Sequence, residues 1–145
     1  MKTSRKGIDL IKELEGYSPE AYRCQAGVLT IGYGHTGNVR EGQRCTREDA
    51  EKWLVQDIAS AERFVNHETQ GVQLRQCQFD ALVSFCYNVG GNAFSRSTLL
   101  KKVKVNPDNP SIRDEFGRWI YAGGRVSSGL VNRREAEADM YFGED

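Results

Sequence analysis

The sequence has 145 residues, of which 39% are hydrophobic and 28% are charged, values that are ordinary for one soluble globular domain. Twenty basic residues balance twenty acidic ones, so no global field attracts nucleic acid or anionic lipid. No apolar run approaches the length of a membrane span, and the N-terminal segment lacks the apolar stretch of a signal peptide. We therefore expect synthesis in the cytoplasm, no nucleic-acid partner, no stable membrane association, a monomer, and free thiols at the four cysteines.

The first predicted element is an amphipathic helix over residues 4–15. Ser4 can cap its N-terminus, apolar residues recur at helical spacing, and Gly16 follows as a C-terminal stop. The pattern then changes to two short strands, 22–24 and 28–33. The turn between them ends at Gly27, which can supply a left-handed residue.

The longest helix signal runs from about residue 46 to residue 65. Thr46 is a suitable N-cap, and the apolar residues that follow form one stripe with a period of 3.6. About 20 residues at 1.5 Å per residue span about 30 Å, which is enough to link two lobes. The remaining signals are helical: they cover residues 79–86, 97–105, 111–120 (with Ser111 as the cap) and 130–142.

These elements predict a single α+β domain over residues 1–145 that is mostly helical. A small hairpin lobe covers about residues 16–45, and a linking helix covers about residues 46–66. The larger helical lobe covers about residues 70–145 together with the N-terminal helix. A cleft between two lobes is a natural ligand site.

Three residues near the hairpin are candidates for chemistry. Glu15 closes the first helix, where the negative end of the helix dipole disfavours ionisation of a carboxylate. A carboxyl group that keeps its proton near neutral pH can donate it to a leaving oxygen. Thr30 lies on the same strand face as Val28 and Gly32, where its hydroxyl group could hold a water molecule.

Cys24 leaves several interpretations open. It suits a small buried residue, a disulfide partner for Cys45, or a reactive thiol. A cysteine–histidine nucleophile with His35 is also conceivable, although an ion pair between His35 and an acid on the long helix fits this histidine better. No P-loop, dinucleotide-binding motif or metal-ligand spacing occurs, so no cofactor and no metal are expected.

Five blocks of sequence, taken together, resemble the phage-type lysozymes, the endolysins of glycoside hydrolase family 24. They occur in the order and spacing of that family and cover nearly the whole chain. The blocks are ELEG, AYRCQAGVLTIGYGHT, QFDALVSFCYNVGGNAFSRSTLL, RWIYAGG and GLVNRREAE.

The resemblance implies an α+β lysozyme-like fold of two lobes. It also implies hydrolysis of the β-1,4 bond between N-acetylmuramic acid and N-acetylglucosamine in peptidoglycan glycan strands. The family's catalytic glutamate and threonine match Glu15 and Thr30, but Cys24 replaces the family's aspartate. By position, Asn88 would line the sugar cleft, and Arg133 would help to hold the hairpin lobe near it. Asp57 would be the acid that pairs with His35.

The replacement of the aspartate leaves three functions open. The first is a hydrolytic lysozyme in which Glu15 is the general acid and Cys24, as a thiolate or a water ligand, serves the opposite face of the sugar with Thr30. The second is a lytic transglycosylase, which needs no activated water. The third is a catalytically impaired wall-binding paralogue. An enzyme made in the host cytoplasm would act on the wall in the periplasm after the membrane is permeabilised.

Overall fold

The computed structural model describes residues 1–143, so the last two residues of the predicted domain lie outside the described part. Contacts group the chain into two compact units. One is Ile8–Ala59, and the other joins Met1–Gly7 to the chain from Ser60 onward. These units divide the chain differently from the expected lobes, because most of the first helix groups with the hairpin segment.

The unit Ile8–Ala59 contains a two-stranded sheet and parts of two helices. Helix α1 (Arg5–Glu15) precedes strands β1 (Ser18–Arg23) and β2 (Leu29–Gly32), and helix α2 (Arg47–Glu68) follows them. Each helix begins as the sequence predicts. Ser4 Oγ accepts the Gly7 amide N–H at 3.3 Å, and Thr46 Oγ1 accepts the Asp49 amide N–H at 3.1 Å.

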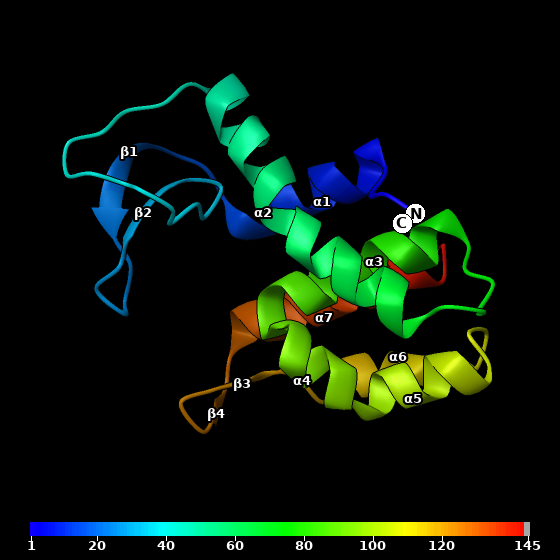
Figure 1. Ribbon diagram of the computed structural model, residues 1–145. Helices are drawn as coiled ribbons and strands as arrows, with labels where there is room; N and C mark the ends of the chain where they lie inside the picture. Colours follow the sequence, from blue (N-terminus) through cyan, green and yellow to red (C-terminus); the bar gives the residue numbers. More distant parts are fainter. Residues whose placement is uncertain (144–145) are drawn as a thin grey trace. The chain divides into compact units, whose positions relative to one another are not determined.

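Strand β1 begins four residues earlier than predicted. Strands β1 and β2 lie side by side (Figure 1). They run antiparallel, with Tyr22 opposite Thr30, and the register shifts between Ser18 and Tyr22. The early part of β1 pairs with a later loop instead, since the Ala21 amide donates to Gln43 O at 2.9 Å and the Cys45 amide donates to Pro19 O at 2.9 Å. Pairing across more than 20 residues leaves no local sequence signal, which is why the prediction missed it.

A glycine allows β2 to approach α2 closely within this unit. The buried residues Ile11, Ile31, Leu54 and Ile58 form much of its core. Gly32 ends β2 with a φ of +66°, and a Cβ built there would lie 2.8 Å from the Ala50 Cβ on α2. The lack of a side chain at Gly32 therefore allows both the left-handed backbone conformation and the close contact between strand and helix.

The second unit is mainly helical, and in it α3 packs against α7 (Figure 1). Its elements after α2 are α3 (Gln76–Val89), α4 (Gly91–Arg96), α5 (Thr98–Val105), α6 (Ile112–Phe116), β3 (Tyr121–Ala122), β4 (Arg125–Val126) and α7 (Ser128–Tyr141). Aromatic rings fill its core: Phe85 meets Phe94, Phe116 and Trp119 edge to face, with centroids 5.5–6.4 Å apart.

Several details of this unit differ from the sequence prediction. The predicted helix over 111–120 is only five residues long and ends at Phe116, and Ser111 makes no capping hydrogen bond with its side chain. The Ser111 hydroxyl donates to Asn109 Oδ1 at 2.9 Å instead. The hairpin β3–β4 was not predicted, although its two turn glycines, Gly123 and Gly124, both have positive φ. Within residues 1–143 no helix is both long and apolar enough to cross a membrane.

Replacing Gly91 with alanine should destabilise the helical unit. A Cβ at this position would lie 2.2 Å from Phe64 Cε2, so the ring or the helix has to move. Overpacking of this kind costs about 1–3 kcal/mol, which urea unfolding would measure. Gly129→Ala is the matched control, because its nearest neighbour would be Ser127 Oγ at 3.8 Å. Equal stability of the two variants would contradict the predicted contact with Phe64.

Candidate active site

Glu15 is the last residue of α1, and its carboxyl group lies against a glycine of the loop that follows β2. Gly16 ends the helix with a φ of 75°, and its amide donates to Lys12 O at 3.0 Å. A Cβ built on Gly34 would lie 3.0 Å from Glu15 Oε1, and Gly34 has a φ of +81°. Only a glycine therefore allows this loop to take its conformation beside the carboxyl group.

Cys24 and Thr30 lie on one face of the hairpin. Tyr22 pairs with Thr30, and Cys24 follows Tyr22 by two residues, which returns its side chain to the same face. The Cys24 amide donates to Val28 O at 3.0 Å and the Gly27 amide donates to Cys24 O at 2.8 Å, so the cysteine opens the tight turn. Thr30 is 5% exposed, and its hydroxyl donates to Val28 O at 3.0 Å.

The turn favours the ionised form of the Cys24 thiol. Hydrogen bonds from the backbone of Val28 and then Ala26 lower the pKa of Cys24, and the Thr30 side chain lowers it further, while desolvation opposes them. Amide N–H groups directed at a sulfur stabilise a thiolate as they would a carboxylate. The hairpin thus supplies an anion-stabilising turn at the position where the resemblance leads one to expect an aspartate.

His35 and Asp57 lie in contact within the same unit. His35 Nδ1 is 2.8 Å from Asp57 Oδ2, and its ring stacks on Trp53 with centroids 4.9 Å apart. His35 is also fixed by two backbone hydrogen bonds with Ile31, each 2.9 Å long. His35 therefore contacts an acid of α2, the kind of partner that the sequence favoured for it over a cysteine–histidine nucleophile.

All four cysteines are free thiols. A Cys24–Cys45 disulfide is also excluded by the sheet, because Cys45 pairs with Pro19, five residues before Cys24 on an extended strand. At about 3.3 Å per residue that separation is about 16 Å, whereas a disulfide requires Cα atoms within about 7 Å.

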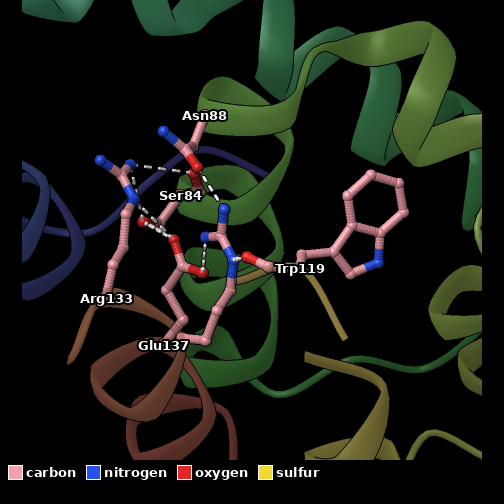
Figure 2. Close-up of polar contacts among 6 residues, drawn as sticks. Ser84, Asn88, Trp119, Arg133 and Glu137 are labelled. Carbon is pink, nitrogen blue, oxygen red and sulfur yellow. Dashed lines mark hydrogen bonds and ion pairs between the residues drawn. The ribbon is translucent and has the colours of Figure 1, made fainter. Parts of the chain in front are cut away.

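Asn88 and Arg133 lie in the other unit, within a network of buried charges that the sequence did not predict (Figure 2). Glu137 is fully buried and receives hydrogen bonds from Ser84 Oγ at 2.6 Å, Arg133 Nε at 3.1 Å and Arg134 Nη1 at 2.6 Å. Asn88 accepts from Arg134. The spacing of Arg133, Arg134 and Glu137 along a helix allows such pairs, but only burial distinguishes them from a solvated helix face.

The side chains of residues 1–143 include no group of three His, Cys, Asp or Glu residues that could hold a metal ion.

A family model described as phage lysozyme matches residues 12–137. The chain belongs to the phage lysozyme family. The expected family and the expected α+β, mostly helical, lysozyme-like fold are therefore confirmed.

Individual relatives agree with this assignment. An endolysin of Acyrthosiphon pisum secondary endosymbiont phage 1 is 43% identical over 97% of this chain and 98% of the relative. The structure of an endolysin from Escherichia coli O157:H7 phage FAHEc1 is 38% identical and superposes with a TM-score of 0.90 over 97% of this chain and 93% of that one. The muramidase domain of SpmX from Asticaccaulis excentricus is 37% identical, with a TM-score of 0.88 and 97% of each chain covered. The coarse functional prediction, an endolysin-type enzyme that lyses peptidoglycan, is supported by these matches.

Cys24 should react with iodoacetamide at a lower pH than an unstructured cysteine. A lowered pKa gives a larger thiolate fraction at neutral pH, and the thiolate is the reacting species. Peptide mapping after labelling across a pH series measures the midpoint for each cysteine. Thr30→Val should move the Cys24 midpoint to higher pH, because it removes one of the groups that lower the pKa.

Cys86 is the internal control for that experiment. It is 1% exposed, and burial raises its pKa to about 12. It should stay unlabelled over the range in which Cys24 reacts. A Cys24 midpoint no lower than that of a cysteine in the urea-unfolded chain would show that the turn does not stabilise the thiolate.

Proposed function

We propose that this protein hydrolyses the β-1,4 bond between N-acetylmuramic acid and N-acetylglucosamine in bacterial peptidoglycan, with Glu15 as the general acid. The observation that carries the proposal is the hairpin turn, whose amides lower the pKa of Cys24 in the same unit as Glu15, the last residue of α1. An acid and an anion-stabilising turn are the two kinds of group that glycoside hydrolysis requires.

The first step breaks the bond between the sugar carbon and the glycosidic oxygen. Glu15 gives its proton to that oxygen, which leaves as a hydroxyl group, and positive charge develops on the sugar ring. The Glu15 carboxyl group lies against Gly34 at the end of a helix, and general acid catalysis needs an acid that is held in position.

The second step adds water to the same carbon. The Cys24 thiolate accepts one proton of the attacking water, with Thr30 orienting that water, and the hydroxide bonds to the sugar. The thiol then releases its proton to solvent and Glu15 regains one, so both groups return to their starting states. Direct attack by the thiolate on the sugar carbon is the alternative. It would form a covalent thioglycoside that water later hydrolyses.

A lytic transglycosylase is the second candidate, and the thiol at position 24 is the feature that favours it. Such an enzyme also begins with protonation by Glu15, but the sugar's own 6-hydroxyl group attacks and gives a 1,6-anhydro end. Mass spectra of the released muropeptides separate the two functions, because each hydrolysis product is heavier by one water.

Glu15→Gln should reduce lysis of permeabilised Gram-negative cells by about 10²–10⁴-fold, because the amide cannot donate the required proton. The measurement is the loss of turbidity at equal concentrations of folded protein. Glu13→Gln, an exposed site on the same helix, is the matched control and should keep full activity. If Glu15→Gln lysed cells as fast as the unchanged protein, Glu15 would not be the acid.

Substitutions at Cys24 test whether the thiolate accepts the proton of the attacking water. Cys24→Ala should reduce lysis, and Cys24→Asp should retain or increase it, because an aspartate can also accept the proton of water. Full activity in Cys24→Ala would remove the thiol from the mechanism. Intact wall binding with no lysis by the unchanged protein would instead identify a catalytically impaired, wall-binding paralogue.

The remaining expectations stay predictions for this chain. They are a monomer without stable membrane association, and synthesis in the host cytoplasm followed by action on the wall once the membrane is permeabilised. Sugar binding by Asn88 and support of the hairpin segment by Arg133 are likewise predictions.

A further inference from the structure

Helix α5 has one apolar face and one basic face. The helix packs against α4 and α6 (Figure 1). The buried residues on its apolar face are Leu99, Leu100 and Val103. The opposite side carries Lys101 and Lys104, which are both exposed, and Val105, the last residue of the helix. We call these three residues the basic face.

Val105 is the apolar residue of the basic face. It is 88% exposed, more than any other large hydrophobic residue among residues 1–143. It lies beside Lys104 and one helical turn after Lys101, so both lysines flank it. An exposed apolar side chain flanked by lysines on a helix is typical of a surface that contacts anionic lipid.

The sequence around α5 is basic, although the whole chain has no net charge. Between Asp80 and Asp108 it has no acidic residue, and its basic residues there are Arg96, Lys101, Lys102 and Lys104. The Asp108 carboxylate is held toward α3, because Gln78 Nε2 donates to Asp108 Oδ1 at 3.0 Å. Asp114 of α6 lines a different hollow, whose other side is formed by α7. The basic face therefore keeps its positive charge.

One carboxylate does contact basic groups beside α5, and two cations already bind it. Glu115 is 3% exposed, with Oε2 2.7 Å from Lys102 Nζ and Oε1 3.0 Å from Arg118 Nε. Two positive charges on one buried carboxylate leave a net positive charge at this place. The Arg118 side chain is 72% exposed, so its Nη groups remain accessible to a ligand.

A hollow of about 330 Å³ lies where α5 begins. It is lined by Arg96, Ser97, Thr98, Glu115, Arg118 and Trp119, and we call it the arginine hollow. Arg96 is exposed and donates from Nε to Asn92 O at 3.3 Å, which leaves its Nη groups for a ligand. A guanidinium group presents paired donors that match the oxygens of a phosphate. Two such groups around one hollow therefore suit a phosphate group.

We infer that the basic face and the arginine hollow together bind an anionic lipid surface. The lysines contact the headgroups, Val105 enters the interface, and one lipid phosphate lies between the two arginines. Thr98 in the hollow and Val105 are seven residues apart, about 10 Å along the helix, so one lipid surface can contact both.

This contact goes beyond the proposed hydrolysis and does not depend on it. A short helix with a few charges binds a lipid surface far more weakly than a spanning helix binds a membrane. The contact is therefore reversible and differs from stable membrane association.

Val105 favours a lipid surface over a soluble polyanion such as nucleic acid. A phosphodiester polymer in water would satisfy the lysines but would leave the valine exposed. A lipid interface removes the valine from water as well, which is favourable for an apolar side chain.

The first test measures sedimentation of the whole chain with vesicles of equal parts phosphatidylcholine and phosphatidylglycerol. The protein should bind these vesicles but not pure phosphatidylcholine, and it should dissociate at high salt, which screens the charges. Each basic side chain near an anionic surface strengthens binding about fivefold, so Lys101→Gln/Lys104→Gln should weaken it about 25-fold. Equal binding to both kinds of vesicle overturns the inference.

The matched control for these lysines is Lys2→Gln/Lys52→Gln. It removes the same charge from two exposed positions outside α5 and should leave vesicle binding close to that of the unchanged protein. An equal loss of binding in the two double variants overturns the inference, because net charge alone would then explain the attraction.

Val105→Ser separates a lipid surface from a soluble polyanion. It should weaken vesicle binding about threefold to tenfold, because less apolar surface leaves water. It should not change binding to a double-stranded DNA oligonucleotide. Val55→Ser, at an exposed valine of α2, is the matched control and should change neither. The inference is overturned if the oligonucleotide binds as tightly as the vesicles and Val105→Ser affects neither.

Arg96→Gln tests the arginine hollow. A phosphate monoester has three terminal oxygens and a diester has two, so two guanidinium groups bind the monoester better. Vesicles with phosphatidic acid in place of phosphatidylglycerol should therefore bind more tightly, and Arg96→Gln should reduce that preference. An unchanged preference overturns the assignment of a lipid phosphate to the hollow.

The outcome of these experiments is separate from the outcome of the lysis assays. Lipid binding does not need cleavage, so a protein that binds the vesicles but does not lyse cells contradicts only the proposed hydrolysis. Lysis by a protein that does not bind anionic vesicles contradicts only the inference.

Discussion

The helical unit depends on one carboxylate that has no contact with solvent. Glu137 is 0% exposed, and a buried charge costs several kcal/mol unless it is paired and hydrogen-bonded. Arg133, Arg134 and Ser84 satisfy it, and these residues connect α7 to α3. Burial lowers the pKa of Arg134 and Glu137 raises it, yet an arginine remains protonated. Loss of Glu137 would remove the carboxylate that both buried guanidinium groups bind, so the packing of the two helices has little freedom.

In the hairpin, hydrogen-bond donors also favour the charged form of an acidic group. There backbone amides, and not cations, lower the pKa of a half-buried thiol, with Cys24 at the start of the turn and Val28 at its end. A turn that stabilises a thiolate in this way would also stabilise a carboxylate, because both accept hydrogen bonds. The replacement of an aspartate by a cysteine is therefore compatible with the local backbone, and its consequence lies in the chemistry of the side chain.

The sequence predicted elements well where the signal is local. The caps at Ser4 and Thr46, the stop at Gly16 and the turn at Gly27 were all predicted, because each depends on residues within one turn of the chain. The predicted start of β1 and the predicted length of α6 were wrong. The first depends on pairing with a distant loop, and the second ends where Phe116 and Trp119 pack around Phe85 instead of continuing a helix.

By itself, the sequence determined the family, the α+β fold class and the spacing of Glu15, Cys24 and Thr30, because periodicity, turn chemistry and matching blocks lie along the chain. Only the tertiary structure decided which charges are buried and which way the Asn88 amide faces. Arg134 and Asn88 are 46 residues apart, and nothing local relates them. A guanidinium that is desolvated and hydrogen-bonded at each of its three nitrogens can fix an amide, whereas the same arginine in water would leave it free to rotate.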